Sequence, residues 1–546
     1  MNKSELVLNL LKRDYLVSPD FFEDFKEEDL KNISAEQIFG NDKPTVLDKN
    51  LLFLIKNNLN IDINWKEFEQ SKVTFEKGKD KKIYQTFLDI FYYDISEKKK
   101  KKIDLILEAV KKPQPIEKFV DEKEGDYPNV VVLDSYKEEL KKREVQDFVS
   151  YFRVRYEAIK KILQSRRELQ NVISINRALN KNGRDNSVLI GLIYDKRITK
   201  NGNLMLNLED PTGHINLIIN KNRGDLFKLG QSLVLDEVIG IEGIVSNNFV
   251  FVNNLFLPDI PVGKELKKAD DESYAIFTAD LHVGSNMFFE EDFLKFIDWL
   301  NGDYGDKNQK EIASKVKYLF IVGDLIDGVG IFPNQDKELF IQDVNLQYEK
   351  CAEFLGKIRK DIKMIICPGN HDALRISEPQ PALDEHFAKS LYDLKNITFV
   401  TNPSLVNIHA SKNFNGFNVL LYHGYSFQYF ADNVEEIRIN GGNDRSDLIM
   451  KLLLQKRHLA PTHASSLYIP NTTEDSLVIK SIPDFFVSAH MHRTSTTDYK
   501  NVTLISCGCW QGQTPFMEKM GIHPDPSRIS LVNLKTREIK ILKFGK

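Results

Sequence analysis

Residues 318–328 read Tyr-Leu-Phe-Ile-Val-Gly-Asp-Leu-Ile-Asp-Gly, an apolar run that stops abruptly at a glycine and an aspartate. The run before Gly323 has the length and the β-branched and aromatic content of a buried strand. Asp324 then stands at the strand end and a tight, glycine-containing turn follows it. Sites in α/β proteins form where the carboxyl ends of strands meet. This stretch therefore predicts an α/β domain with a functional carboxylate at a strand end.

Four more blocks in the second half of the chain repeat this pattern. Each apolar run again has the length of a buried strand and leads directly into Asp, His or Asn. If all five strands stop at polar residues, those residues lie along one edge of a sheet. One such block is weak support, but five in series indicate a two-metal hydrolase. The runs are 274–279, 364–367, 419–421 and 485–487, and the polar blocks after them are Asp280-Leu-His282, Gly369-Asn370-His371-Asp372, Tyr422-His423-Gly424 and Ala489-His490-Met-His492.

The spacing of these residues suggests how two ions would be held. Two divalent ions about 3.5 Å apart can neutralise a phosphodiester, supply a nucleophile and stabilise a leaving group. One ligand must bridge the ions, and the carboxylate of Asp324 suits that role. Asp280 and His282 are two residues apart, so on an extended segment they point the same way and can chelate one ion. His490 and His492 have the same spacing and could each reach a different ion.

The remaining residues of the blocks offer further ligands and a catalytic group. Asn370 supplies a neutral oxygen and His423 an imidazole. A mixture of imidazole and carboxylate suits Mn²⁺, Fe²⁺, Zn²⁺ or Ni²⁺ better than a pure Mg²⁺ site. His371, beside the ions but not bound to them, could protonate a leaving alkoxide or stabilise charge on phosphate. Asp372 could orient that imidazole, and Arg375 is a candidate phosphate contact.

Other polar residues near the blocks receive a structural interpretation. Asp327, Ser285 and Gly328 are interpreted as turn residues or as partners that orient ligands, rather than as ligands. The histidines outside the blocks are interpreted as caps or turn residues, as is usual for a lone histidine at a strand end. These are His214, His386, His409, His458, His463 and His523.

The composition sets wider limits. A chain of 546 residues is too long for one core, so two to four domains are expected. Hydrophobic content of 42% and charged content of 28% are typical of a soluble globular protein. The N-terminus lacks an apolar signal core and no apolar stretch is long enough to span a bilayer, so a cytoplasmic location is expected. The net charge of −4 gives no global sign of nucleic-acid binding, which would need local basic patches.

Patterns along the chain predict five segments. Residues 1–75 carry helical patterns and predict a small helical domain, interpreted as an interaction or packing module. Residues 76–135 are polar and predict a flexible charged linker, whose run Lys98–Lys102 could contact nucleic acid or simply be solvated. Residues 136–185 predict a connecting region with a long amphipathic helix over about 136–169. A β-barrel is predicted for residues 186–262. The α/β domain that contains the five blocks is predicted for residues 272–546.

The predicted barrel is suggested by short runs with period-two alternation, separated by turn signals such as Asp210-Pro-Thr-Gly213. Five or six short strands in about 70 residues suggest a small closed barrel. The segment Leu208-Glu-Asp-Pro-Thr-Gly213 with the strand after it resembles the strand-turn-strand of OB folds, which often bind single-stranded nucleic acid. Tyr194 and Phe249 are candidate stacking residues, and an interdomain role is an equal alternative. The runs are 188–193, 204–208, 215–219, 234–238, 241–245 and 250–257.

The five blocks, in this order, resemble the motifs of the calcineurin-like metallophosphoesterases. Ala489 stands where many members have glycine, and every ligand position is filled. The resemblance implies a metallophosphoesterase α/β sandwich and His371 as the catalytic histidine. It assigns one metal to Asp280, His282, Asp324 and His492, and the other to Asp324, Asn370, His423 and His490.

A narrower resemblance covers the chain from the long helix onward. The order of helical N-terminus, linker, OB fold and phosphoesterase is similar to the small subunits of the archaeal D-family DNA polymerase. The segments that carry this resemblance are Gly323–Ile331 with Pro333, Gly369–Arg375, Arg457–Thr462 and Cys509–Thr514 with Met520-Gly521. The resemblance implies a metal-dependent 3′→5′ exonuclease, acting on single-stranded 3′ ends and primer-template DNA, with Mn²⁺ as the first candidate cofactor. It also implies a heterodimer with the large catalytic polymerase subunit.

Two other functions stay open on the residues alone. A phosphomonoesterase or protein phosphatase of the calcineurin-like class could use the same five blocks. A non-catalytic scaffold of the polymerase would need no metal, and the complete ligand set argues against pure scaffolding. Turnover of a small phosphomonoester without DNA cleavage would favour the first alternative, and failure to bind divalent metal would favour the second.

Overall fold

The computed structural model describes residues 16–17, 46–47, 129–137, 142–180, 186–246 and 248–545. The chain divides into two compact units, Met1–Glu117 and Lys118–Lys546. In the first unit the described residues are β1 (Leu16–Val17) and β2 (Val46–Leu47), which pair in parallel. The remainder of the predicted helical domain 1–75, and the predicted linker up to residue 128, lie outside the described residues.

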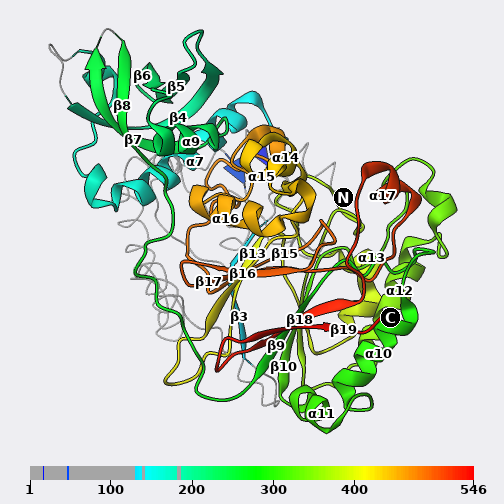
Figure 1. Cartoon of the computed structure of the whole chain (residues 1–546). Coiled ribbons are helices and arrows are strands. Elements are labelled where there is room, and N and C mark those ends of the chain that lie inside the picture. Colours follow the sequence, from blue (N-terminus) through cyan, green and yellow to red (C-terminus); the bar gives the residue numbers. More distant parts are fainter. Residues whose placement is uncertain are drawn as a thin grey trace, which may run out of the picture. The chain divides into compact units, whose positions relative to one another are not determined.

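The second unit contains two six-stranded sheets and a closed barrel (Figure 1). The first sheet has the order β12-β11-β10-β9-β18-β19, and its strands β9 to β12 run parallel. Helices α10 (Glu290–Asn301) and α12 (Val344–Gly356) cover one face of it through a shared core. Helices α11 (Lys307–Ser314) and α13 (Glu385–Tyr392) and the 3₁₀ turn η4 (Gln335–Glu338) complete this part. The strands are β9 (Tyr274–Thr278), β10 (Val316–Val322), β11 (Lys363–Cys367), β12 (Ile397–Phe399), β18 (Arg528–Asn533) and β19 (Ile539–Lys543).

The second sheet has the order β16-β17-β15-β14-β13-β3 and mixes parallel and antiparallel pairs. Its outer face is covered by helices that share one apolar core with β14, β15 and β17. The helices are α14 (Phe427–Asn433), α15 (Glu435–Ile439) and α16 (Ser446–Lys456), with the 3₁₀ turns η5 (Gly442–Asp444) and η6 (His463–Ser465). The strands are β3 (Val130–Ser135), β13 (Ser404–Ile408), β14 (Phe417–Leu421), β15 (Phe485–Ser488), β16 (Ser495–Tyr499) and β17 (Val502–Ser506).

The two sheets face one another across a third core. Phe277 of β9 stacks on Phe320 of β10 with ring centroids 4.8 Å apart, and its centroid lies 5.8 Å from that of Phe485 in the other sheet. These side chains are fully buried with Val419 and Ile505. Because both faces of the inner strands are buried, their sequences are continuous apolar runs without alternation. This explains why the five runs were recognisable as strands.

One strand of the second sheet lies in the range for which the sequence predicts a linker. β3 pairs antiparallel with β13 and forms the edge of the sheet. The apolar run Val130–Leu133 is short and stands beside a long polar stretch. Such a run carries no information about a partner strand that follows far along the chain, so composition alone placed it with the linker.

The barrel closes in the order β4-β5-β6-β8-β7. Buried and half-buried residues alternate along β5 and β6, as the period-two pattern predicts. The predicted run 234–238 does not form a strand of its own, because Val234 and its neighbours turn around the buried carboxylate of Glu237, which accepts from the Val234 N–H. The strands are β4 (Asn186–Ile198), β5 (Leu204–Asp210), β6 (Gly213–Ile219), β7 (Val238–Ser246) and β8 (Phe249–Phe256), with α9 (Gly224–Gln231) between β6 and β7.

The predicted long helix is shorter than expected. Helix α7 spans Val145–Gln164 and begins at a capping box formed by Glu144 and Asp147. The 3₁₀ turn η3 (Arg167–Leu169) and helix α8 (Ile175–Leu179) follow it. Tyr151, Tyr156 and Ile159 of the apolar stripe are buried, whereas Phe148 near the start of the helix is 39% exposed. In the part of the chain that the structure describes, no helix is long and apolar enough to cross a membrane.

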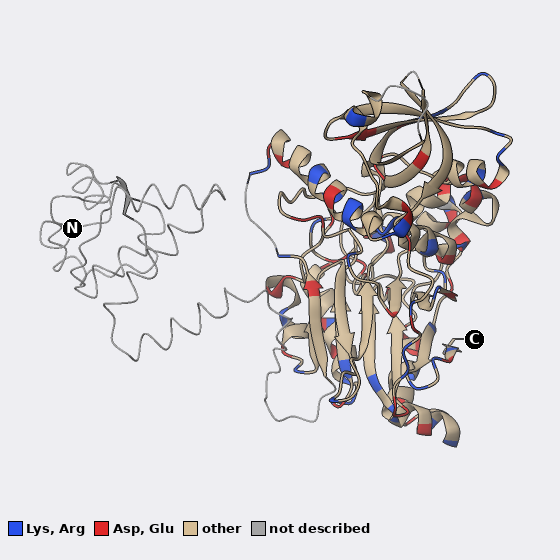
Figure 2. Cartoon of the chain, turned by 90° about the vertical axis from the view of Figure 1, so that its left-hand side faces the viewer, with Lys and Arg blue, Asp and Glu red and all other residues tan. Residues whose placement is uncertain are grey.

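The surface carries charges of both signs. In Figure 2 the positions of basic and acidic residues, coloured on the ribbon, are interspersed along the barrel and the elements below it. This agrees with the small net charge of −4. Any attraction for a polyanion must therefore come from local groups of cations or from bound metal ions.

Candidate metal centre

The five polar blocks converge at the carboxyl ends of strands from both sheets. β9, β10 and β11 of the first sheet lead to Asp280, Asp324 and Asn370, and β14 and β15 of the second lead to His423 and His490. The expectation that they lie along one edge of a single sheet was therefore wrong. Apolar runs identify strands but do not reveal which strands pair. The site instead lies where the ends of two facing sheets meet.

The backbone at the site is held in an unusual conformation. Left-handed φ angles of 50° to 69° occur at five candidate ligands, which are Asp280, His282, Asp324, His490 and His492. Non-glycine residues in this region cost of order 1–3 kcal/mol each and cluster at functional sites. Gly323 and Gly369 are required nearby, because a Cβ at either position would collide with His423 or Asp324. The surrounding fold therefore imposes this geometry on the side chains.

The first group of candidate ligands comprises Asp280, His282 and His492, whose ligand atoms lie within 4.8 Å of one another. The Nε2 atoms of His282 and His492 are 3.1 Å apart. His282 Nδ1 lies 3.0 Å from Asp327 Oδ1, so Nδ1–H donates to that carboxylate and Nε2 presents a lone pair to the site. Asp280 Oδ1 is buried without a hydrogen-bond partner. A divalent cation is the group that this set of converging acceptors fits.

The second group comprises Asp324, His423 and His490, again with ligand atoms within 4.8 Å. His423 Nδ1–H donates to the carbonyl of Val322 at 2.9 Å, which leaves Nε2 facing the site. That Nε2 atom lies 3.3 Å from Asp324 Oδ2 and 3.0 Å from Asn370 Oδ1. Asp324 Oδ2 also lies 3.8 Å from His282 Nε2 in the first group. Asp324 thus stands between the two groups, where a bridging carboxylate would be.

The pKa values of the buried groups show that the cluster needs positive charge. Burial raises the pKa of Asp280 to about 7. Burial opposes protonation of His423, but the charge of Asp324 outweighs it and raises the pKa of that imidazole to about 10. Burial lowers the pKa of His490 to about 3, so this imidazole is neutral with a free lone pair. Carboxylates that attract positive charge, beside a neutral imidazole such as that of His490, form a donor set suited to divalent metal.

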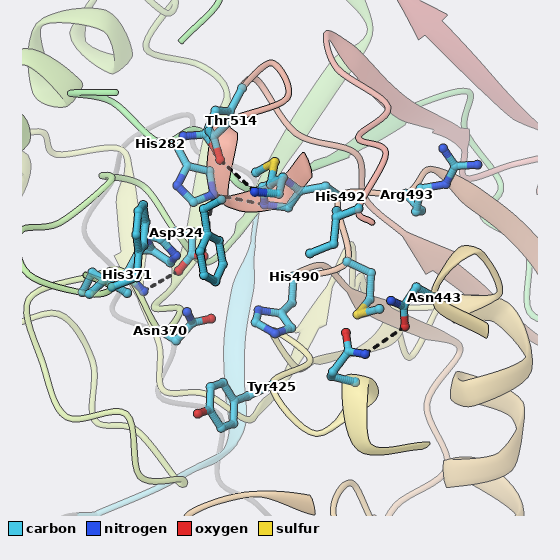
Figure 3. Close-up of a pocket in the computed structure, with 18 of the residues that line it drawn as sticks. His282, Asp324, Asn370, His371, Tyr425, Asn443, His490, His492, Arg493 and Thr514 are labelled. Atoms are coloured by element: carbon cyan, nitrogen blue, oxygen red, sulfur yellow. Dashed lines mark hydrogen bonds and ion pairs between the residues drawn. The ribbon is translucent and has the colours of Figure 1, made fainter. Parts of the chain in front are cut away.

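His371 lies beside these groups, and one of its two ring nitrogens is hydrogen-bonded to the backbone. Its Nδ1–H donates to the backbone carbonyl of Asp327 at 2.8 Å. Its ring stands edge-on to that of His282, with centroids 4.7 Å apart. Burial lowers the pKa of His371, and Nε2 is left for a reacting group. Figure 3 shows His371, Asn370, Asp324, His490 and His492 around a common space.

Two other predicted catalytic residues are not brought to the reacting side of the site. Asp372 accepts from the backbone N–H groups of Gly369 (2.9 Å) and Leu325 (3.4 Å) and from the Tyr348 hydroxyl (3.2 Å). It therefore fixes the loops and does not orient the His371 ring. Arg375 donates to the carbonyl of Pro379 at 2.8 Å and lies over the ring of Tyr136. It does not line the pocket, so the structure offers no support for a phosphate contact.

The residue that orients the histidines is Asp327, which the sequence placed in this supporting role. Its carboxylate accepts from His282, from Gln335 Nε2 at 3.0 Å and from Gln511 Nε2 at 2.9 Å. Gln511 also donates to the Ser285 hydroxyl. Gln335 and Gln511 were not singled out by their chemistry, although Gln511 lies in the segment Cys509–Thr514 that carries part of the resemblance. Only the tertiary fold brings these amides to Asp327.

A pocket of about 300 Å³ opens beside the metal-ligand groups. The candidate ligands form one part of its wall, and Tyr425 and Arg493 lie on its rim in Figure 3. The other part is apolar and includes Phe332 and Phe516. The pocket is therefore polar at the candidate ligands and apolar beside them.

Comparisons with known proteins agree on a family. The model of the family of DNA polymerase alpha/epsilon B subunits matches residues 275–497. A DNA polymerase II small subunit from Methanothermobacter thermautotrophicus is 40% identical over 423 residues, which are 77% of this chain and 84% of that protein. One from Pyrococcus horikoshii is 36% identical over 405 residues, or 74% of this chain and 63% of that protein.

A solved structure described as a novel archaeal phosphodiesterase aligns with 49% of this chain and 98% of its own length, at 13% identity. Its TM-score of 0.24 is too low to support an argument about the fold. The sequence relatives carry the assignment, because the first of them matches at 40% identity over most of both chains. The chain belongs to the family of DNA polymerase II small subunits, the small subunits of the archaeal D-family polymerases.

Proposed function

We propose that this chain acts as a two-metal 3′→5′ exonuclease that removes mismatched primer ends within a D-family polymerase. The observation that carries the proposal is the convergence of all seven candidate ligands from five strand ends at one buried place. Five of them have left-handed backbone, and backbone strain of this kind clusters at functional sites. A mismatched 3′ end is frayed, so it can enter a recessed site without the cost of melting paired bases.

The residues divide between two ions as the family resemblance implies. The first ion would be held by Asp280, His282, Asp324 and His492, and the second by Asp324, Asn370, His423 and His490. Mn²⁺ is the first choice, and Mg²⁺, Fe²⁺, Zn²⁺ and Ni²⁺ are alternatives for this mixture of imidazole and carboxylate. When bound, the ions would neutralise the phosphodiester and lower the pKa of water.

The chain's own residues then perform two tasks. The carbonyl of Asp327 holds the proton of His371 on Nδ1, so Nε2 is the atom that exchanges a proton with the reacting phosphodiester. The carboxylate of Asp327 holds His282 in the tautomer that turns Nε2 to the metal. One residue thus sets the orientation of both a ligand and the catalytic histidine.

The remainder of the chain is assigned to assembly and DNA. The relatives are named small subunits, so we assign to this chain a large catalytic polymerase subunit as partner. The closed five-stranded barrel is assigned as an OB fold for single-stranded DNA, and residues 272–546 as the phosphoesterase domain. Tyr194 is 66% exposed and Phe249 36% exposed on the barrel, so both rings are accessible to bases.

A gel time course tests the proposed reaction. The full-length protein is incubated with Mn²⁺ and primer-templates that carry a 3′ mismatch and a label at either the 3′ or the 5′ end. We expect stepwise shortening from the 3′ end, faster on mismatched than on matched primers. Hydrolysis of a small phosphomonoester with intact DNA would instead support a phosphatase, and no hydrolysis together with no metal binding would support a scaffold.

Replacing Asp327 with alanine should weaken the first metal site. Loss of the partner that orients a metal-binding histidine typically lowers metal affinity by roughly 10- to 100-fold, and we expect a decrease of that order. The measurement is calorimetric titration of the metal-free protein with Mn²⁺. Asp336→Asn is the matched control, because Asp336 is an exposed carboxylate on the same loop that makes no side-chain contact with the histidines. Equal affinity in Asp327→Ala and the wild type would refute the assigned role.

A further inference from the structure

The apolar side of the pocket is built around two phenylalanine rings. Phe332 and Phe516 stack with ring centroids 4.7 Å apart and an interplanar angle of 18°. Both line the pocket that also contains His282, Asp324 and His371. Phe516 is 39% exposed, so part of its ring remains accessible although it stacks on Phe332. We call these two rings the aromatic wall.

The loop that carries Phe332 is tied to the metal-ligand groups. It follows Asp327 directly, and Gln335 at its end donates to the Asp327 carbonyl (2.8 Å) and carboxylate (3.0 Å). The Gln335 side chain also accepts from the N–H of Ile331 at 2.8 Å. These bonds close the loop on itself, so Phe332 is held at a fixed place beside the site.

The helix that carries Phe516 is equally well anchored. Helix α17 (Pro515–Met520) begins at Thr514, whose hydroxyl accepts from the Met517 N–H at 3.2 Å. It ends at Gly521, which has a φ of +67° and provides a left-handed C-cap. The guanidinium of Arg493, the residue after His492, donates to the His523 carbonyl at 2.8 Å. The segment is thereby fixed to the strand end that supplies His492.

We propose that the aromatic wall is the stacking surface for the base of the terminal nucleotide whose phosphodiester lies at the metal centre. This inference rests on the proposed nuclease function and adds how the substrate is selected. An aromatic face gains free energy from stacking any nucleobase, whereas a base that is paired within a duplex already has its faces covered. The rings form part of the wall of a pocket of about 300 Å³, so a base must leave its stack in the duplex to lie against them.

The aromatic wall also predicts that the site does not distinguish the identity of the terminal base. The two rings, and Ile331, Ile376 and Ile522 beside them, offer no side-chain donor or acceptor to a base edge, whereas Gln428, Asn443 and Thr514 elsewhere in the pocket lining do. Stacking without such hydrogen bonds discriminates poorly between bases. The wall therefore selects an unpaired end regardless of which base it carries, which matches removal of any mismatch. It also gives a role to the segments Gly323–Ile331 with Pro333 and Cys509–Thr514 with Met520-Gly521, which border it.

The test compares two substrates in the full-length protein with Mn²⁺. One is a 5′-labelled single-stranded oligonucleotide with a normal 3′ nucleotide, and the other ends in an abasic tetrahydrofuran residue. We expect the wild type to prefer the normal end by on the order of 10- to 100-fold in kcat/KM, as expected for one stacked base. In Phe516→Ala the ratio of kcat/KM for the normal end to that for the abasic end should fall to about one, and Phe516→Tyr should retain the wild-type ratio. Phe340→Ala is the control, because Phe340 is 82% exposed and does not line the pocket.

A binding measurement separates stacking from cleavage. A 3′-terminal 2-aminopurine should lose fluorescence on binding to the His371→Ala protein with Mn²⁺ and should keep it with the His371→Ala, Phe516→Ala double variant. If Phe516→Ala slows both substrates equally, the ring only shapes the metal centre and the stacking proposal is overturned. If the wild type cleaves neither substrate, the nuclease proposal fails. The 2-aminopurine fluorescence then tests stacking by itself. Quenching in the His371→Ala protein that is absent from the double variant with Phe516→Ala supports stacking. Equal fluorescence in the two proteins overturns it.

Discussion

Replacing His371 with alanine is expected to lower the rate of Mn²⁺-dependent DNA hydrolysis by about 10²- to 10⁴-fold, the usual contribution of a positioned acid or base. The structure gives the reason. Asp327 fixes the proton on Nδ1 and leaves Nε2 of His371 beside the two groups of candidate ligands, in the wall of the pocket. The measurement is the initial rate on a single-stranded oligonucleotide, taken together with the Mn²⁺ stoichiometry from calorimetry.

The stoichiometry distinguishes a catalytic role from a ligand role. If His371 is not a ligand, the alanine variant should still bind two ions while its rate falls. His386→Ala is the control, because His386 is an exposed histidine on α13 whose removal should change neither quantity. Unchanged hydrolysis in His371→Ala would remove this residue from the mechanism. Loss of one bound ion would move it into the ligand set, with His282 and Asp327 as its neighbours.

The strand ends were predictable from the sequence because the signal is local. Each of the five apolar runs is buried on both faces, so hydrophobicity alone marks it, and the candidate ligand follows within a few residues. The pairing of those strands was not predictable. One sheet contains β9 to β12 and the other contains β13 to β17. The residues of a strand do not indicate which strand pairs with it. The same limit placed β3 in the linker.

The supporting contacts of the site were less predictable than its ligands. The sequence predicts roles for Asp372 and Arg375 because they follow His371 closely. The fold instead turns Asp372 toward Tyr348 on α12 and Arg375 toward the carbonyl of Pro379. Gln511 reaches Asp327 from a segment far along the chain. Candidate ligands are recognised by residue type at a strand end, whereas supporting partners depend on which surfaces the tertiary fold brings together.

Replacing Arg155 with methionine is expected to lower the free energy of unfolding by roughly 3–5 kcal/mol, the cost of leaving a buried charge without its partner. Arg155 on α7 is 1% exposed and donates to Asp475 at 2.7 Å and to the Pro461 carbonyl at 2.9 Å. Tyr151 donates to the other oxygen of Asp475 at 2.8 Å. The helix beside the barrel is thus joined to the body through one buried carboxylate. Urea denaturation of the full chain measures the change.

Lys160→Gln on the same helix is the matched control. Lys160 lies 3.3 Å from Glu157 with both side chains partly exposed, and such a pair contributes at most about 1 kcal/mol. A loss in Arg155→Met no larger than in this control would mean that the buried pair is not what joins α7 to the body. The comparison is informative because the two residues differ in burial but share the helix, the charge and an acidic partner.

The pH dependence of the Arg155→Met defect identifies its electrostatic part. His458 Nε2–H donates to the same Asp475 carboxylate at 2.9 Å, and burial together with the Arg155 charge lowers the pKa of His458 to about 4. In the wild type, a lowered pKa means that stability is present above about pH 6.5, the unfolded value, and is lost as pH falls toward 4. Without Arg155, the pKa of His458 should rise, because the imidazolium can then compensate Asp475. Protonation would therefore stabilise the variant in the range where it destabilises the wild type. The difference between the two proteins should be largest near pH 7.5 and shrink by pH 5, whereas a defect of packing alone would be the same at both.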